Sequence, residues 1–371
     1  MSRQKIKMAL FAATLAALLL LATFVLCEVL LRACSFLLPE PARSMVEEAN
    51  RIRLCNTRMF DGTSILLPET KKADVVVVGD SFPFGTYVRE NDAFPAKLGQ
   101  RLGLTIVDLG VASTIPPEYQ RMAEISTLYS PSLLVYCVFA RGFNNPPNLG
   151  EPGELTRENA AQPNPGDERL FHRTMTGRMR FQILRKQVTN LSLILQIVKM
   201  QRQPLSKNLD RIAERINDRY FVFAGTNYWD PQISWNTAAV RDSTESNVAL
   251  IQKVNELAAK QKFSLLVVLI PTKEMVYGPL TQAGPRIYSE SHHQTYKELK
   301  SRLDAAGIPC LDLTSPLRNA ARSGTPLYFS IDGHLDEIGH AEVARILAEH
   351  LTAGPKPSHL KPKPGNSSAH E

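Results

Sequence analysis

Cysteine and tryptophan are scarce in this chain of 371 residues, which contains five of the former and two of the latter. The cysteines are odd in number and irregularly spaced, and no Cys-x-x-Cys pair occurs. A disulfide framework or a structural zinc site would need a recognised spacing, so the pattern favours neither. Cys137 and Cys310 instead lie in apolar runs, where cysteine usually behaves as a small buried hydrophobic side chain.

The sequence also lacks internal repeats and the features of a nucleic-acid-binding protein. Its formal net charge is +7, but part of that excess lies before residue 8 and in the C-terminal tail. No recognition helix, zinc spacing or alternation of aromatic and basic residues is present, so we expect no nucleic-acid partner. A hydrophobic content of 44% is ordinary for a protein that buries a core.

One long uncharged run, residues 8–27, is long enough to cross a hydrocarbon core of ~30 Å. Arg3, Lys5 and Lys7 precede it, so the positive-inside rule places residues 1–7 in the cytoplasm and the remainder outside. A cleaved signal peptide is the alternative, but its apolar region is usually shorter and no small-x-small cleavage site follows. The sequence predicts a single-pass signal anchor with an extracytoplasmic domain, periplasmic or extracellular.

The remaining chain is expected to comprise a linker (28–70), polar and weakly structured at 40–68, an α/β domain (71–351) and a disordered tail (352–371) rich in proline, serine and lysine. Within the domain, residues 148–244 interrupt the regular pattern and are interpreted as an insertion. It either forms one wall of the site or is a surface excursion without a substrate role. A short strand is expected within it at 221–223.

Five short apolar runs alternate with helical segments in the domain. Such alternation implies right-handed parallel crossovers. The sequence therefore predicts a three-layer α/β/α architecture around a central, mostly parallel sheet. The expected strands are 73–78, 104–109, 132–139, 264–270 and 308–313, and the expected helices are 92–102, 118–128, 191–200, 246–261, 293–306 and 337–351.

Gly79-Asp80-Ser81 directly follows the first of these runs, which contains four consecutive valines. In an open α/β sheet, ligands bind beyond the carboxyl ends of the strands. A serine there is exposed, and its backbone N–H can face a reacting oxygen. The alternative is a serine that caps the next helix, with Asp80 a structural hydrogen-bonder at the turn.

A serine needs a base to act as a nucleophile, and the base needs a partner that fixes its tautomer. His334 is the candidate base, and Asp332, two residues earlier, is its candidate partner. Both lie just before the last helix, at the same edge of the sheet as Ser81. We therefore expect Ser81, His334 and Asp332 to form a catalytic triad.

Two other strand ends carry candidate oxyanion donors. Gly110 follows the second run, and Asn144 and Asn145 follow the third. The N–H groups of Ser81 and Gly110 and the side-chain amide of Asn144 are the expected oxyanion hole. A shift of one residue would make Asn145 the donor instead.

No metal or cofactor is expected from the remaining histidines. His292, His293 and His340 have no carboxylate cluster and no metal-ligand spacing. Lys273 and Glu274 follow the fourth run, where they either line the cleft or form an exposed pair.

These motifs resemble those of the SGNH (GDSL) serine hydrolase family. Gly79-Asp80-Ser81 is similar to its first block, Gly110 to its second, and Gly142-Phe143-Asn144-Asn145 to its third. Asp332-Gly333-His334 is similar to its last block. The order and spacing agree over 73–351 apart from the insertion. The resemblance implies a flavodoxin-like α/β/α fold.

Two departures from the family pattern bear on the reaction. Asn145 stands where the family usually has Asp, and Asp-x-His replaces the usual Asp-x-x-His. The shorter spacing also occurs in alginate-type O-acetyltransferases of the superfamily, but there it precedes the serine. Pro271-Thr272-Lys273-Glu274 is also similar to those membrane-associated relatives.

The resemblance implies an extracytoplasmic serine enzyme that cleaves acyl esters, O-acetyl esters foremost, through an acyl-serine. If water attacks the acyl-serine, the enzyme is an esterase. If a sugar hydroxyl attacks it, the enzyme is an O-acetyltransferase of a cell-surface or exported polysaccharide. A membrane anchor suits a polysaccharide or lipid-linked glycan as substrate. The remaining alternative is a non-catalytic glycan-binding or assembly protein on the same scaffold.

Overall fold

The computed structural model describes residues 3–40, 42–51, 72–111, 123–140, 211–217 and 219–353, together with short pieces at 65–66, 70, 171–172, 181, 184, 192 and 194–195. The central sheet has five strands in the order β3-β2-β4-β8-β9, and every neighbouring pair is parallel. Its strands are β2 (Val75–Val78), β3 (Ile106–Asp108), β4 (Leu133–Phe139), β8 (Ser264–Ile270) and β9 (Cys310–Asp312). All five expected strands are thereby confirmed.

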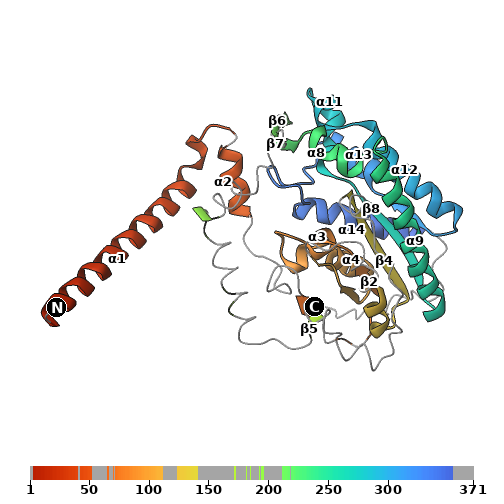
Figure 1. Ribbon diagram of the computed structural model, residues 1–371, viewed down its shortest axis with the longest axis horizontal. Helices are drawn as coiled ribbons and strands as arrows, with labels where there is room; N and C mark the ends of the chain where they lie inside the picture. The colour runs from red at the N-terminus through yellow and green to blue at the C-terminus, as the bar shows by residue number, and fades with distance from the viewer. Residues whose placement is uncertain are drawn as a thin grey trace, which may run out of the picture.

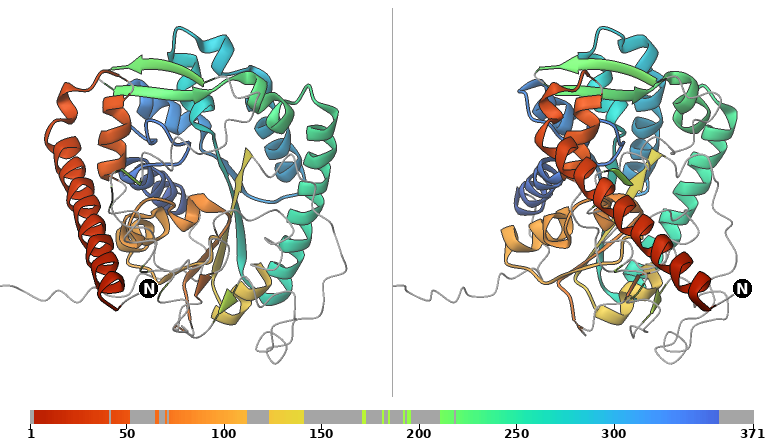
Figure 2. Two further views of the ribbon diagram at one scale, coloured as in Figure 1. Left: turned by 60° about the vertical axis from the view of Figure 1, so that its left-hand side comes forward. Right: turned by 90° about the vertical axis from the view of Figure 1, so that its left-hand side faces the viewer.

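The apolar runs form strands because this sheet is covered on both faces. Every residue of β2 and of β4 is buried, as expected for the middle of a parallel sheet. Helices α4 (Phe94–Leu102) and α14 (Glu337–Ala353) pack together on one face. Helices α9 (Ala238–Gln261) and α12 (Glu290–Ala305) cover the other (Figures 1 and 2). The predicted α/β/α architecture is confirmed.

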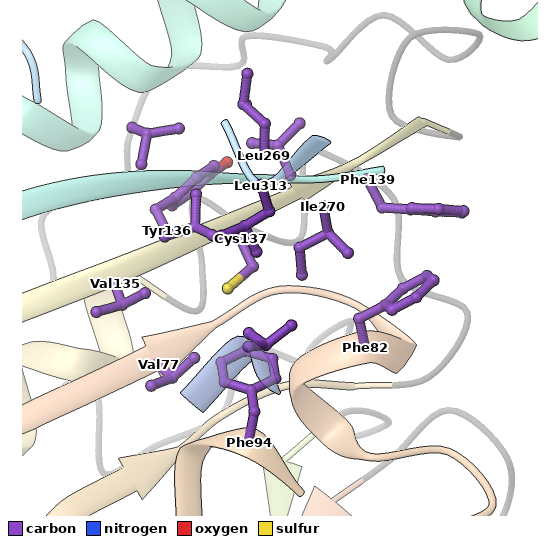
Figure 3. Packing of buried hydrophobic residues seen from close by; sticks show 14 of the residues in the cluster. Val77, Phe82, Phe94, Val135, Tyr136, Cys137, Phe139, Leu269, Ile270 and Leu313 are labelled. Atoms are coloured by element: carbon purple, nitrogen blue, oxygen red, sulfur yellow. The ribbon is translucent and has the colours of Figure 1, made fainter. Parts of the chain in front are cut away.

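The core continues beyond the strands into the turn that follows β2. Phe82 in that turn packs against Phe139 at the end of β4, with ring centroids 4.3 Å apart, and Ile270 at the end of β8 lies beside them (Figure 3). Cys137 and Cys310 are free and buried, as expected. The carboxyl ends of the central strands are therefore held by aromatic packing.

Part of the expected insertion is described. An antiparallel hairpin joins β6 (Arg211–Ile216) to β7 (Arg219–Ala224), which contains the expected strand at 221–223. Helix α8 (Thr226–Ile233) follows, and α9 begins at Ala238 rather than at 246. Most of 191–200 lies outside the described residues. A further two-residue pair joins β1 (Ile65–Leu66) to β5 (Phe171–His172).

The shorter helices complete the connections. The segment expected as a helix at 118–128 is helical at 123–126 and ends in a 3₁₀ turn, Thr127–Tyr129, while 118–122 lie outside the described residues. The others are α3 (Ser81–Phe84), α10 (Lys273–Tyr277), α11 (Gly284–Ile287), α13 (Thr314–Arg322) and the 3₁₀ turns Ser35–Leu37, Glu90–Asp92 and Gly278–Leu280. The end of α14 at Ala353 leaves the expected disordered tail outside the described residues.

The N-terminal helix α1 (Arg3–Ala33) projects from the α/β body, and its segment Phe11–Ala33 is apolar and long enough to cross a membrane (Figure 1). The expectation of weak structure at 40–68 is wrong where the chain forms a helix. Helix α2 (Ala42–Arg51) folds back against the body. Its Val46 is buried with Val88 and Phe329. This packing joins segments far apart in the chain, so the local sequence did not predict it.

Helices α4 and α14 are joined by a buried histidine. His340 Nδ1 accepts the hydrogen bond of the Phe94 N–H at 3.2 Å, and the two rings stack. Burial, assisted by the nearby positive charges of His334 and Lys97, lowers the pKa of His340 to about 3. The folded protein therefore needs this side chain to be neutral.

We predict that His340 makes the fold sensitive to acid. The unfolded chain binds a proton at His340 near pH ~6.5, but the folded chain does not until about pH 3. Stability is therefore lost as the pH falls from about 6.5 toward 3, by up to about 1.4 kcal/mol per pH unit. His340→Asn keeps an acceptor for the Phe94 N–H and removes the titration. Thermal unfolding of the full chain in detergent at pH 7 and pH 5 should show a smaller loss for the variant. An equal loss in both proteins would contradict this.

Candidate functional site

Ser81 lies at a tight turn between β2 and α3. Gly79 adopts a φ of +154°, and a Cβ there would lie 2.9 Å from Cys137 Cβ and from Pro83 Cγ. Asp80 caps α3, with its carboxylate accepting the Phe82 N–H at 3.0 Å. The turn therefore requires glycine at position 79 and uses Asp80 to cap the helix that begins at Ser81. Asp80 is the structural hydrogen-bonder that was expected, and the cap of α3 is Asp80 rather than Ser81.

Ser81, His334 and Asp332 are joined in one hydrogen-bonded row. His334 Nε2 lies 2.8 Å from Ser81 Oγ, and His334 Nδ1 lies 2.5 Å from Asp332 Oδ1. The same Asp332 oxygen accepts the backbone N–H of His334 at 2.9 Å. The serine lies in the turn after β2 and the other two lie in the loop before α14, so the fold unites residues from both ends of the domain. Their catalytic role stays a prediction.

The electrostatics of Asp332 suit an orienting carboxylate. Burial alone would raise the pKa of Asp332, but the charge and hydrogen bonds of His334, helped by Lys273, hold it well below its usual range. An ionised Asp332 accepts from Nδ1–H and so leaves the lone pair of His334 Nε2 facing the Ser81 hydroxyl. The rings of Phe82 and Tyr87 flank the imidazole at 5.2 and 5.7 Å between centroids. This environment restricts the ring to one orientation.

The candidate oxyanion donors are described only in part. Ser81 is the first residue of α3, so helix geometry gives its N–H no acceptor inside the helix. Gly110 lies close by, because a Cβ there would be 2.5 Å from Phe84 N. Its N–H donates to Asp108 Oδ1 at 2.7 Å, so it would have to share or exchange that bond to serve an oxyanion. Asn144 and Asn145 lie outside the described residues.

Lys273 and Glu274 are both buried, which rules out the exposed pair. Lys273 Nζ donates to the carbonyl of Asp332 at 3.0 Å, and Glu274 Oε1 accepts the Ala224 N–H at 3.0 Å. Sequence reasoning missed Glu48, which bonds the same loop from α2. No pattern in the sequence connects a glutamate of the expected linker with a loop so far along the chain.

The other histidines have partners of their own. His292 Nε2 lies 2.6 Å from Asp230, and His293 Nε2 lies 3.0 Å from Asp312. Among the described residues, no three histidine, cysteine or acidic side chains gather as metal ligands would. What the described site offers is a hydroxyl, an imidazole and a carboxylate in a row, an arrangement suited to acyl transfer.

Comparison with known proteins finds two partial matches to this chain. Residues 232–369 match the family "SGNH hydrolase-like domain, acetyltransferase AlgX", a range that contains Asp332 and His334 but not Ser81. The chain is 30% identical over 148 residues to "Probable alginate O-acetylase AlgJ" of Azotobacter vinelandii, a match that covers 39% of this chain and 36% of that protein.

The chain thus spans little more than a third of the length of this curated relative. A crystal structure aligned with 77% of this chain and 99% of its own has 11% identity and a TM-score of 0.37, too distant a likeness to argue from. Residues 232–369 are therefore similar to the SGNH hydrolase-like acetyltransferase domain, and 148 residues of the chain are similar to an alginate O-acetylase.

Proposed function

We propose that this protein transfers acetyl groups, through an acetyl-serine at Ser81, from an ester donor to a hydroxyl of a cell-surface or exported polysaccharide. The observation that carries the proposal is the row of hydrogen bonds from Ser81 Oγ through His334 to Asp332. The matches to the acetyltransferase family and to the alginate O-acetylase support acetyl as the group and a polysaccharide as the acceptor.

In the first half-reaction, Ser81 Oγ attacks the ester carbonyl while His334 Nε2 takes the hydroxyl proton. The N–H of Ser81, with Gly110 and Asn144 as further candidates, stabilises the tetrahedral oxyanion, and one such donor lowers the barrier by about 2.7–4 kcal/mol. The intermediate then collapses, and His334 returns the proton to the departing alcohol. Acetyl-Ser81 and neutral His334 remain.

In the second half-reaction, His334 takes the proton of an acceptor hydroxyl as that oxygen attacks acetyl-Ser81. Collapse breaks the bond to Ser81 Oγ, which recovers its proton from His334. Asp332 stabilises the imidazolium in both halves without taking the proton itself. A sugar hydroxyl gives O-acetylation, whereas water gives hydrolysis by the same residues.

Hydrolysis is the second candidate function, and one observation favours it. Ser81 precedes Asp332 and His334, as in the SGNH hydrolases and opposite to the alginate-type acetyltransferases. In either case, we propose that α1 anchors the protein with the catalytic domain outside the cytoplasm, where such glycans are exposed. The length and apolar composition of Phe11–Ala33 support the anchor.

The first test is labelling of the full chain in detergent with a fluorophosphonate probe, which reacts with activated serines. We expect the wild type to label and Ser81→Ala not to, because Ser81 is the hydroxyl that faces an imidazole base. Ser323→Ala, which removes an exposed serine of the C-terminal cap of α13, is the matched control and should label as the wild type does. Equal labelling of Ser81→Ala and wild type would remove Ser81 as nucleophile and favour the glycan-binding scaffold.

Enzyme activity should also fall at acidic pH. His334 must be neutral to accept the serine proton, so kcat/KM for acetyl release should decline as the pH drops through the range of about 5 to 8 in which histidine titrates. Asp332→Asn should lower kcat by about 10⁴-fold, because the imidazole then lacks the partner that fixes its tautomer. A flat profile from about pH 5 to 8 would argue against His334 as the base.

The fate of the acetyl group decides between the two candidate functions. With p-nitrophenyl acetate as donor, we expect an oligosaccharide of alginate to divert acetyl from water to sugar, observed as an acetylated oligosaccharide by mass spectrometry. Ser81→Ala should form none. Release of acetate alone, at a rate unaffected by the oligosaccharide, would establish the esterase instead.

A further inference from the structure

We propose that Glu48, on helix α2 beside the candidate membrane helix, is a positioning residue of the active site that holds the backbone of Asp332. The inference rests on the proposed function, because a positioning role requires a reaction at Ser81. It extends the site to a segment outside the family match at 232–369 and makes α2 an active-site element.

Glu48 binds the loop immediately before Gly333 and His334. Its Oε2 accepts the N–H of Ile331 at 2.7 Å, and its Oε1 accepts the N–H of Asp332 at 3.0 Å. The side chain is almost completely buried, with the residue 2% exposed. One carboxylate therefore fixes two consecutive peptide groups, including the one that carries the candidate orienting residue.

Lys273 holds the same loop through its carbonyl groups. Its Nζ donates to Phe329 O at 3.3 Å, to Ser330 O at 3.1 Å and to Asp332 O at 3.0 Å. Asp332 is thus held by its N–H through Glu48 and by its C=O through Lys273. The two buried charges have opposite signs and share a loop, so each reduces the cost of burying the other.

Strand β7 of the hairpin bonds both ends of the loop. The Val222 N–H donates to Ser330 O at 2.8 Å. Arg219 Nε donates to Ser330 Oγ at 2.9 Å, and Arg219 pairs with Asp336 at 3.0 Å. These bonds end at Ser330 and resume at Asp336. Glu48 and Lys273 bond the backbone of Asp332, which lies between these two positions.

The charge of Glu48 matters because both of its oxygens are acceptors. Protonation would turn one of these oxygens into an O–H donor and a weaker acceptor, so its bond to the backbone N–H would weaken. Burial raises the pKa of Glu48 to about 7, with Asp332 adding to the effect and Lys273 and the two N–H bonds opposing it. Among the described residues, Lys273 on α10 and Asp332 on the loop are the charged groups that shift the pKa of Glu48, and Arg219 on β7 bonds the neighbouring Ser330. The hold on Asp332 therefore weakens as the pH falls through about 7.

The experiment compares Glu48→Gln with Glu47→Gln in the full chain in detergent. Glu47 is the preceding residue on α2, and its exposed carboxylate pairs with Arg43. We measure the rate of fluorophosphonate labelling of Ser81, kcat and KM for p-nitrophenyl acetate, and thermal unfolding. Glu48→Gln should lower the labelling rate and kcat by about 10- to 100-fold with KM within about twofold, because a small misplacement of catalytic groups costs about that much. Glu47→Gln should match the wild type.

The pH profile separates positioning from mere stabilisation. In the wild type, protonation of Glu48 weakens its hold on Asp332, so kcat/KM should gain a component of decline as the pH falls through about 7. Glu48→Gln lacks this titrating group, so its profile should have a shallower slope in that range. A purely structural role would change the unfolding temperature and leave this slope unaltered.

The outcomes distinguish the two proposals. No labelling of the wild type would overturn the proposed function and this inference together. Labelling of the wild type, Glu47→Gln and Glu48→Gln at one rate would overturn the role of Glu48 while leaving Ser81 as the nucleophile. If Glu48→Gln does not fold, Glu48→Asp keeps the charge but shortens the reach. We expect slower labelling of that folded variant, and a wild-type rate would overturn the inference.

Discussion

The hydrogen bond between His334 Nε2 and the Ser81 hydroxyl is the interaction on which the rest of the structure depends, because it joins segments that the chain order keeps far apart. Parallel pairing of β2 with β4, and of β4 with β8, aligns the carboxyl ends of these strands. The packing of Phe82 on Phe139 then fixes the turn that carries Ser81 (Figure 3). A one-residue slip in this register would move the hydroxyl away from the imidazole.

The opposite side of this bond is supported by buried charge rather than by apolar packing. Glu48, Lys273 and Asp332 are all buried around one loop, and each would be costly to bury alone. Their hydrogen bonds to backbone groups use the charges to fix peptide planes, which apolar side chains of the same volume cannot do. Such an arrangement gives up some stability for a defined loop conformation, a compromise common where strain and buried polar groups serve a site.

The sheet could be predicted because buried parallel strands are continuous apolar runs, as Val75–Val78 illustrates. Ser81, Asp332 and His334 could be predicted as neighbours because the turn after a central strand and the loop before the last helix were both expected at one edge of the parallel sheet. Other features depend on contacts between distant segments. The fold of α2 depends on the meeting of Val46 with Phe329, and the bond of the Gly110 N–H depends on the side-chain rotamer of Asp108. Neither leaves a local pattern in the sequence.

The order of the site residues along the chain bears on how this protein relates to the acetyltransferases it resembles. The family match contains Asp332 and His334, together with Lys273, but the serine lies far upstream of it. A triad is defined by geometry and roles rather than by sequence order, and the same constellation occurs in several orders on different folds. In a parallel sheet, the loop before α14 and the turn after β2 lie at one edge whichever comes first in the chain. A change of order can therefore leave the geometry intact, provided that the loop bearing Asp332 and His334 is held, and here residues both inside and outside the matched range hold it.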